Sequence, residues 1–495
     1  MIEAMDWPQF RGPNHDGVST DRILKQWSGP VTNPVWRIPL GSGLGSIAVS
    51  GGRVLTQVRR LVGGADLEVC LALNATNGVE LWATPVDVAS YPNGGVGSDD
   101  GPRTTPSVEA GSVYVLTSYL KLLRLDAASG AMIWSNDLRV AYGGNVIPWQ
   151  NAASPLVDNG LIYVNANCGT GTLLALRASD GRQVWRSQDE AQTHSTPVLA
   201  TIRGVRQLIF ATQSGLVSLD PLTGARLWWF AYPFSYGTSL AVSPVVDRNV
   251  VFVCGAHIYE MGSVALRVSL TNEAWTTTQL WSTNNPASHW MTPVCHDGFL
   301  YGQFGIQSFD SVNAQLKCIE LRTGTPMWST NGFGRGGTLR VDNHLLTLTE
   351  RGDLVLFRPE PNAYTEVARL QAIINYSANA NRCWNVPAVC DGRVYLRSTA
   401  QAACFDLALP DLRLDPPQPL DANRLQLTVR TTNGTPLNPV RLTGLAVQTT
   451  TNLSLAVTQW ITLTNTLRLT NGAVQVENVE AGREARRYFI VSEPP

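Results

Sequence analysis

Short apolar segments alternate with turns along most of the chain, and they recur in a fixed order. A Ser/Thr-Pro pair opens an apolar run, and a turn leads into a second run, as in Thr105-Pro106 before Val113-Tyr114-Val115. A later run ends in a polar phrase with a Gly, and a Trp follows four positions after that Gly. The pairs are Gly78 and Trp82, Gly130 and Trp134, Gly181 and Trp185, Gly224 and Trp228, and Gly324 and Trp328. A recurrence of about 40–50 residues is typical of stacked or radial supersecondary units.

Each repeat predicts four short antiparallel strands, which make one blade of a β-propeller. First strands are expected near Ile47, Pro106, Pro155, Pro197, Pro244, Pro293, Leu339 and Pro387. The last repeat stops at Cys404-Phe405-Asp406 without a fourth strand, whereas the strand-like segment 34–39 belongs to no repeat. If segment 34–39 completes the last blade, the ring closes and leaves no exposed sheet edge. The sequence therefore predicts an all-β fold, an eight-bladed β-propeller closed by an N-terminal strand.

Composition divides the chain into four regions. We expect an N-terminal extension over 1–30, the propeller over 31–408, a Pro-rich linker over 409–424 and a small β-sandwich-like module over 425–495. Prolines stiffen the linker, and the hairpin dipeptides Asn433-Gly434 and Asn471-Gly472 mark turns in the module. The module carries no Gly and Trp phrase, so it is not counted as a blade.

The recurring tryptophans predict contacts between neighbouring blades. The Gly of each phrase allows the positive φ that a short hairpin with a bulge requires. The Trp lies on the outer strand, where its indole can pack against the next blade with its N–H bonded to the backbone. We expect this structural docking role for Trp36, Trp82, Trp134, Trp185, Trp228, Trp281 and Trp328.

Charged residues make up 15% of the chain and the formal net charge is −1, which gives no basis for nucleic-acid binding. No apolar run approaches the ~20 residues that a membrane-spanning helix needs. The first residues show no signal peptide, so we expect either a cytosolic chain or a removed leader. The cysteines are expected to be buried free thiols, with a disulfide between Cys383 and Cys390 as the alternative. Their spacing does not fit a zinc site.

In a propeller, the segments that lead into the first strands meet at one mouth of the central channel. Here they carry Arg103, Trp149, His194, Tyr236, His289, Trp290, Arg335, Arg382 and Trp384. Aromatic rings with Arg and His around a funnel are typical of a site for a small molecule or a glycan. The alternative is that these side chains simply line and fill the channel. Asp99 and Asp100 could bind a hard cation, but an exposed acidic loop explains them equally well, and no metal site is assigned.

The repeats resemble the tryptophan-docking repeats of quinoprotein dehydrogenases and PQQ-like β-propellers, especially at Leu219-Asp220-Pro221-Leu222-Thr223-Gly224-Ala225-Arg226-Leu227-Trp228. The opening Asp6-Trp7-Pro8-Gln9-Phe10-Arg11-Gly12-Pro13-Asn14 is similar to the start of a bacterial group of such propellers that is usually exported. This resemblance covers roughly residues 6–408 and implies the propeller fold, with a periplasmic or secreted location after removal of a signal peptide. It implies no single activity, because the superfamily holds quinone-dependent dehydrogenases and also non-enzymatic scaffolds, among them an outer-membrane β-barrel-assembly lipoprotein.

Our leading hypothesis is a non-catalytic scaffold of the bacterial cell envelope or exterior that binds a protein segment or a glycan, as a monomer without a cofactor. The first alternative is an alcohol or sugar dehydrogenase that uses PQQ with Ca²⁺, and the second is a carbohydrate-active enzyme with the same funnel. The dehydrogenase resemblance implies a metal ion beside the quinone and often a vicinal Cys pair. This chain has no Cys-Cys and no CxxCH haem motif. No catalytic residue is assigned.

Overall fold

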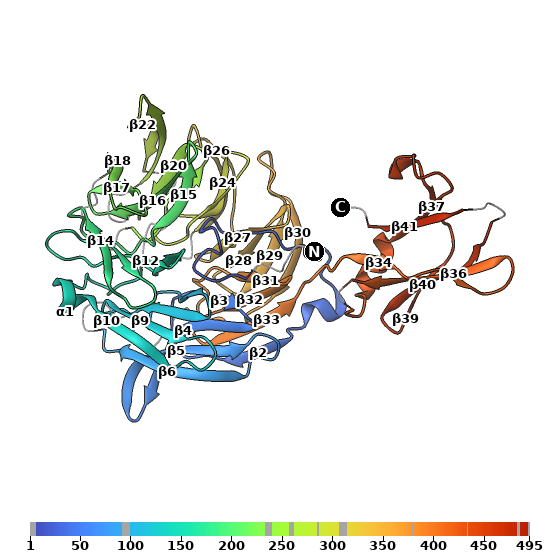
Figure 1. Cartoon of the computed structure of the whole chain (residues 1–495), viewed down its shortest axis with the longest axis horizontal. Helices are drawn as coiled ribbons and strands as arrows, with labels where there is room; N and C mark the ends of the chain where they lie inside the picture. Colours follow the sequence, from blue (N-terminus) through green and yellow to red (C-terminus); the bar gives the residue numbers. More distant parts are fainter. Residues whose placement is uncertain are drawn as a thin grey trace. The chain divides into compact units, whose positions relative to one another are not determined.

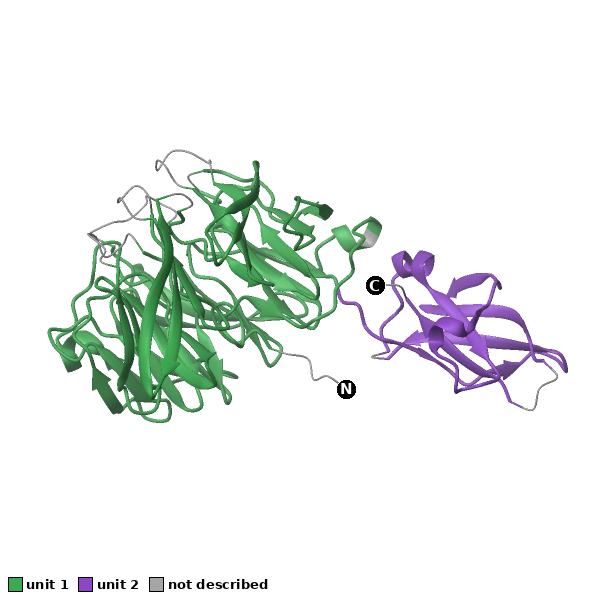
Figure 2. Ribbon diagram, turned by 90° about the horizontal axis from the view of Figure 1, so that it is seen from above, with its two compact units in different colours: residues 1–407 green, residues 408–495 purple. Residues whose placement is uncertain are grey.

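The computed structural model of the chain describes residues 6–91, 100–232, 240–256, 262–284, 287–305, 314–378, 380–432, 434–482 and 486–493. The chain folds into two compact units, Met1–Leu407 and Ala408–Pro495 (Figure 2). Strands dominate both units (Figure 1). The helical turns among the described residues are short: η1 (Gly29–Thr32), α1 (Leu138–Tyr142), η5 (Pro439–Gly444) and η6 (Val457–Gln459). The protein is therefore all-β, as its sequence predicts.

Four-stranded antiparallel sheets make up the first unit, and most of them come from consecutive strands of one repeat. From the N-terminus these sheets are β3 (Ala48–Ser50), β4 (Arg53–Val62), β5 (Ala65–Asn74) and β6 (Glu80–Val88); β7 (Ser107–Glu109), β8 (Ser112–Leu116), β9 (Lys121–Asp126) and β10 (Met132–Asp137); β11 (Leu156–Asp158), β12 (Leu161–Asn165), β13 (Leu173–Arg177) and β14 (Gln183–Ser187); β15 (Val198–Ile202), β16 (Val205–Thr212), β17 (Gly215–Leu219) and β18 (Arg226–Ala231); β19 (Val245–Asp247), β20 (Val250–Cys254), β21 (Ser263–Thr271) and β22 (Ala274–Thr283); and β23 (Val294–His296), β24 (Phe299–Phe304), β25 (Gln315–Glu320) and β26 (Pro326–Thr330).

Two further sheets of this unit recruit strands from the N-terminus. One contains β27 (Gly337–Val341), β28 (His344–Leu348), β29 (Asp353–Phe357) and β30 (Glu366–Gln371), and β1 (Val18–Ser19) pairs with β27 in parallel. The other contains β31 (Ala388–Cys390), β32 (Arg393–Arg397) and β33 (Gln401–Asp406), and β2 (Trp36–Pro39) is its fourth strand. The register of β2 on β33 places Trp36 opposite Cys404. This is the pairing that the unmatched segment 34–39 predicts.

The Ser/Thr-Pro pairs join neighbouring sheets at the start of their first strands. The backbone N–H of Thr105 donates to Ser154 Oγ at 2.9 Å, and that of Ser154 donates to Thr196 Oγ1 at 2.9 Å. Ser46 makes the same bond to Thr105, and Ser243 makes it to Thr292. Because the following Pro has no N–H, the ladder begins one residue later, as at β7 and β11. The hydroxyl before the Pro is therefore a link between sheets, a role that the pattern alone did not reveal.

Indole rings make a second set of contacts between neighbouring sheets. Trp82 Nε1 donates to the Ala127 carbonyl at 3.1 Å, and a Cβ on Gly130 would lie 2.6 Å from Trp82 Cδ2. The indole N–H also reaches a carbonyl of the next sheet in five other cases, Trp36 to Ala75, Trp134 to Ala178, Trp185 to Pro221, Trp281 to Leu321 and Trp328 to Glu360. Trp228 differs, because its Nε1 donates to Gln207 Oε1 within its own sheet at 2.7 Å. A glycine at the contact lets the ring approach the backbone.

The hydrophobic core lies between the faces of successive sheets. Leu156 and Tyr163 of one sheet, for example, share a buried cluster with Leu199 and Phe210 of the next. The eight cysteines are free, and all except the half-buried Cys295 are buried. The disulfide alternative for Cys383 and Cys390 is therefore not formed.

The N-terminal segment, defined here as residues 7–24, runs along the free edges of several first strands. Trp7 exchanges backbone hydrogen bonds with Val49 at 2.9 and 2.7 Å, and the Val108 N–H donates to the Pro8 carbonyl at 2.8 Å. The buried Arg11 donates to the carbonyls of Thr292 and Pro293 at 3.1 and 3.0 Å. The region expected as an N-terminal extension thus packs onto the first unit and covers strand edges.

The second unit has its own core and corrects one expectation. One sheet contains β34 (Leu412–Leu414), β35 (Gln418–Pro419), β36 (Arg424–Thr431), β39 (Leu467–Thr470) and β40 (Ala473–Glu480), and another contains β37 (Ala446–Thr450), β38 (Ile461–Thr462) and β41 (Tyr488–Ser492). The segment 409–424, expected to be a linker, carries β34 and β35, which both pair with β36. The prolines stay at positions where the edge strand needs no N–H, so they do not prevent pairing.

Candidate binding site at the entry mouth

The segments that lead into the first strands meet at one end of the first unit, which we call the entry mouth. The Leu44 N–H donates to the Pro102 carbonyl at 2.8 Å, and Asn385 Nδ2 donates to the Leu44 carbonyl at 2.7 Å. On another side, the His194 N–H donates to the Leu240 carbonyl at 3.0 Å. These bonds hold successive entry segments together and fix the side chains that they carry.

Two tryptophans and two arginines form the aromatic cluster of this mouth. The Trp290 and Trp384 ring centroids are 4.7 Å apart, and the His289 ring lies 4.9 Å from that of Trp290. The Arg382 guanidinium lies 4.0 Å from the Trp384 centroid, and that of Arg335 lies 5.0 Å from it. Cation–π contacts of this kind gain strength where water is excluded, and both arginines are buried. His289 and the two indoles are half-buried, so their rings form the accessible surface of the cluster.

The Glu350 carboxylate holds Arg335 and Trp384 of the aromatic cluster in position. Its carboxylate accepts hydrogen bonds from the Arg335 backbone N–H at 2.9 Å and from Trp384 Nε1 at 3.0 Å. Arg335 Nη2 lies 3.3 Å from Glu350 Oε1, and the two side chains are only 8% and 1% exposed. Glu350 is therefore committed to positioning its neighbours and is not placed as an available base.

The sequence argument missed Glu350 for a topological reason. It considered only the segments that lead into first strands. In an antiparallel meander, however, the turns between second and third strands open at the same end of the sheet. Glu350 lies in such a turn, between β28 and β29. A search of those turns for acids would have found it.

A second group of predicted residues gathers around Arg103. Arg103 Nη2 pairs with Asp100 Oδ1 at 2.8 Å, and its guanidinium lies 6.0 Å from the Trp149 centroid. The His194 Nε2 lies 2.7 Å from the Gln150 carbonyl, so this nitrogen carries the ring proton. Burial, together with the nearby positive charge of Arg103, lowers the pKa of His194 to about 3. His194 is therefore neutral at ordinary pH and donates structurally.

The structure thus brings the predicted residues together in two groups. Arg103, Trp149 and His194 form one, and His289, Trp290, Arg335, Arg382 and Trp384 form the other. Backbone hydrogen bonds link the two groups, because the His194 N–H donates to the Leu240 carbonyl and the Ala241 N–H donates to the His289 carbonyl, both at 3.0 Å. Tyr236 and Asp99 lie outside the described residues.

A quinone with its metal ion fits only part of this arrangement. The stacked indoles and the arginines offer contacts for a flat anion. The ion would need several available carboxylate or amide oxygens, yet Glu350 and Asp100 are each bonded by an arginine. In the described ranges, no three His, Cys, Asp or Glu side chains gather in a way that could hold a metal ion. Glu350 and Asp100 are therefore committed to their arginines and are not free carboxylate ligands for a Ca²⁺ ion beside a quinone. Nor does any helix in these ranges have the length and apolar character needed to cross a membrane.

Known proteins with similar sequences include outer membrane assembly factors and quinone-dependent dehydrogenases. The family model described as outer membrane protein assembly factor BamB matches residues 65–330, more than half of the chain. BamB of Nitrosomonas eutropha is 24% identical over 253 residues, which cover 49% of this chain and 54% of that protein. The quinohemoprotein alcohol dehydrogenase of Comamonas testosteroni is 27% identical over 152 residues, covering 28% of this chain and 21% of that enzyme. The chain thus spans about half the length of the first relative and less of the second.

Solved structures of both kinds share the fold. BamB from Moraxella catarrhalis superposes with a TM-score of 0.51 at 14% identity, covering 76% of this chain and 97% of that one. The quinohemoprotein alcohol dehydrogenase from Comamonas testosteroni superposes with a TM-score of 0.56 at 14% identity, covering 88% and 84%. At such identities the likeness is one of fold, that of PQQ-type propellers.

Proposed function

Since the chain belongs to the PQQ_2 family, described as outer membrane protein assembly factor BamB, we propose that it is a non-catalytic scaffold whose entry mouth binds a segment of another protein. The observation that carries this proposal is that the Glu350 carboxylate is already engaged by neighbouring side chains. This carboxylate beside the aromatic cluster is bonded by both Arg335 and Trp384. What remains accessible is a surface of indole and imidazole rings, which suits the recognition of apolar and aromatic side chains.

We also infer the architecture and the setting of this scaffold. The sheets of the first unit are the blades of one closed eight-bladed ring, a view supported by the contact between the first strands β31 and β3 and by the bonds between Ser/Thr-Pro pairs. A place in the cell envelope is supported by the names of the relatives, which are outer membrane protein assembly factors. The second unit is a small β-sandwich-like module attached to this ring.

The first experiment identifies the segment that the mouth binds. A photoreactive residue replaces His289 in the full chain expressed in its host, and a second variant carries it at Val140 on α1, which is 84% exposed. We expect a specific adduct with one peptide at position 289 and none at 140. Mass spectrometry of the adduct gives the bound sequence, which is then made as a synthetic peptide.

Affinity measurements on that peptide test the aromatic cluster. Trp290→Ala is the informative variant, because Trp290 Nε1 makes no hydrogen bond with a described residue and only the ring is lost. Loss of an interface aromatic costs about 2 kcal/mol or more, so calorimetry should show binding weakened at least about tenfold. Trp229→Ala removes a 42% exposed indole elsewhere on the unit and should leave affinity unchanged.

Several results would contradict a protein-binding scaffold. If Trp290→Ala and Trp229→Ala bind the peptide with equal affinity, the entry mouth does not bind it. Saturable PQQ binding that depends on Ca²⁺ and is lost in Trp290→Ala would move the function to oxidoreduction. Binding of oligosaccharides in place of the peptide, with the same sensitivity to Trp290→Ala, would identify the partner as a glycan.

A further inference from the structure

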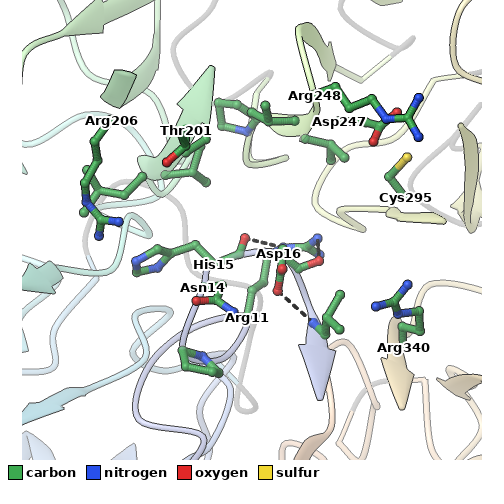
Figure 3. Close-up of a pocket in the computed structure, with 18 residues that line it drawn as sticks. Arg11, Asn14, His15, Asp16, Thr201, Arg206, Asp247, Arg248, Cys295 and Arg340 are labelled. Atoms are coloured by element: carbon green, nitrogen blue, oxygen red, sulfur yellow. Dashed lines mark hydrogen bonds between the residues drawn. The ribbon is translucent and has the colours of Figure 1, made fainter. Parts of the chain in front are cut away.

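A cavity of about 390 Å³ lies beside the first strands β15 and β19 and reaches the ends of these strands that are remote from the entry mouth. Thr201 stands at the end of β15, Arg248 follows β19, and Arg340 lies near the end of β27. Asn14 and Asp16 of the N-terminal segment face them across the cavity (Figure 3). We call this space the exit cavity.

The path of the N-terminal segment explains why the exit cavity exists. Its bonds run to β3, β7 and β27, and Arg11 reaches the start of β23. Within the described ranges, none of its hydrogen bonds reaches the sheets of β15 and β19, whose first strands line the cavity. The segment therefore covers part of this end of the unit and leaves a walled space beside the other part.

Positive charge predominates in the lining. It contains four arginines, Arg11, Arg206, Arg248 and Arg340, and two acids, Asp16 and Asp247. His15 adds no charge, because burial lowers its pKa to about 3. Two of the arginines already have partners. Arg11 is bonded to backbone carbonyls, and Arg206 pairs with Asp158 at 2.6 Å.

The other two arginines retain donors for a ligand. Arg248 is exposed and forms no hydrogen bond or ion pair with a described residue. Arg340 Nη1 donates to His296 Nδ1 at 2.7 Å, while its buried Nε has no partner among the described residues. A guanidinium with unused donors beside a cavity is suited to bind a carboxylate or a phosphate.

We propose that the exit cavity binds a small organic anion carrying a carboxylate or phosphate group, with Arg248 and Arg340 as its direct partners. The volume lies in the range of about 300–1,000 Å³ found for small-molecule sites, which favours a metabolite-sized anion over a bare ion. The N-terminal segment forms one wall, and no residue of the entry mouth takes part. This site is independent of the scaffold function proposed above.

Titration of the full chain tests this proposal. The probes are citrate, glucose 6-phosphate and inorganic phosphate, with uncharged glucose as the control ligand, followed by calorimetry and thermal shift. We expect saturable binding of an organic anion that weakens as salt rises, because the charges are partly exposed. The Arg248→Gln variant should weaken it about tenfold, since a hydrogen bond to a charged group contributes about 1.5 kcal/mol or more.

Two more variants make the test decisive. Asp247→Asn removes a carboxylate from the lining and should tighten binding several-fold, an effect that damage to the fold would not produce. Arg182→Gln removes an arginine that is 81% exposed and outside the cavity, and it should change nothing. Equal binding by Arg248→Gln and Arg182→Gln overturns the proposal. So does weaker binding by Asp247→Asn, or the absence of saturation with every anion up to about 10 mM.

Discussion

At the scale of single residues, burial decides what each carboxylate can do. Glu350 is 1% exposed but retains an arginine and an indole as partners. Glu68 on β5 is fully buried as well, yet its partners are the neutral Tyr91 hydroxyl at 2.9 Å and the Ser118 N–H at 3.1 Å. Burial without a cation raises the pKa of Glu68 to about 7.

This raised pKa predicts a dependence of stability on pH. Between pH 4.5 and 7 the folded chain holds a proton on Glu68 that the unfolded chain has lost, so unfolding becomes easier as pH rises. Glu68→Gln should match the wild type near pH 4.5 and exceed its free energy of unfolding by about 3 kcal/mol above pH 7. Urea unfolding at several pH values measures this difference. The exposed Glu273→Gln is the matched control, and an identical pH profile for both variants would contradict the prediction.

Residue identity in the entry mouth was largely predictable from the sequence. Arg335, Arg382 and Trp384 were expected at one mouth because propeller topology brings entry segments together, and they lie in contact with one another. The separation of these residues from Arg103, Trp149 and His194 was not predictable, because it depends on which ring meets which guanidinium. The exit arginines were missed because Arg248 and Arg340 look like ordinary turn and strand residues until the N-terminal segment is placed.

At the scale of elements, one indole joins one sheet to the next. Trp281 Nε1 donates to the Leu321 carbonyl at 2.8 Å, and a Cβ on Gly324 would lie 2.7 Å from Trp281 Cδ2. The outer strand β22 is therefore held to the following sheet by both a hydrogen bond and close packing. Six of the seven expected docking tryptophans donate such a hydrogen bond to the following sheet. The contribution of each indole to the free energy of unfolding is a prediction.

Removal of the Trp281 indole should weaken the packing between its own sheet and the following sheet. Trp281→Ala leaves a cavity that the surrounding sheets cannot fill, so we expect a loss of about 3–5 kcal/mol in the free energy of unfolding. Trp229→Ala is the matched control, because its indole is 42% exposed and bonds only the nearby Ser214 at 3.2 Å. Denaturant unfolding compares the two. A loss below about 1 kcal/mol for Trp281→Ala would show that the sheets hold together without it.

Strand positions were predictable because Pro marks where most first strands begin. Pro155 and Pro197 are followed directly by β11 and β15. The short strands β34 and β35 were not predictable, because a segment with four prolines carries no period-2 pattern. Their pairing with β36 arises from tertiary contacts that override local preference.

At the scale of the whole first unit, the entry mouth and the exit cavity occupy opposite ends of the same first strands. These strands are only three to five residues long, as β11 and β15 illustrate, so the two sites are close, although no side chain of the aromatic cluster lines the exit cavity. Sites that share no side chain and no mobile element are expected to bind independently.

A double test of this independence uses one variant from each site. Trp290→Ala should leave anion affinity at the exit cavity unchanged, and Arg248→Gln should leave peptide affinity at the entry mouth unchanged, each within about twofold. Calorimetry with the two ligands, separately and together, measures both. A reciprocal change of about fivefold or more would instead show that the strands transmit a coupling between the sites.

The pairing of β1 with β27 and of β2 with β33 has a consequence for how the protein is made. Val18 and Trp36 leave the ribosome early, but their partners Arg340 and Cys404 are among the last residues of the unit to be synthesised. The earliest strands must therefore wait, unpaired, while several hundred residues follow them. Contacts at such sequence separation make folding slow. Completion of the unit thus waits until β33 has been made, and until then the early strands are open to wrong pairing.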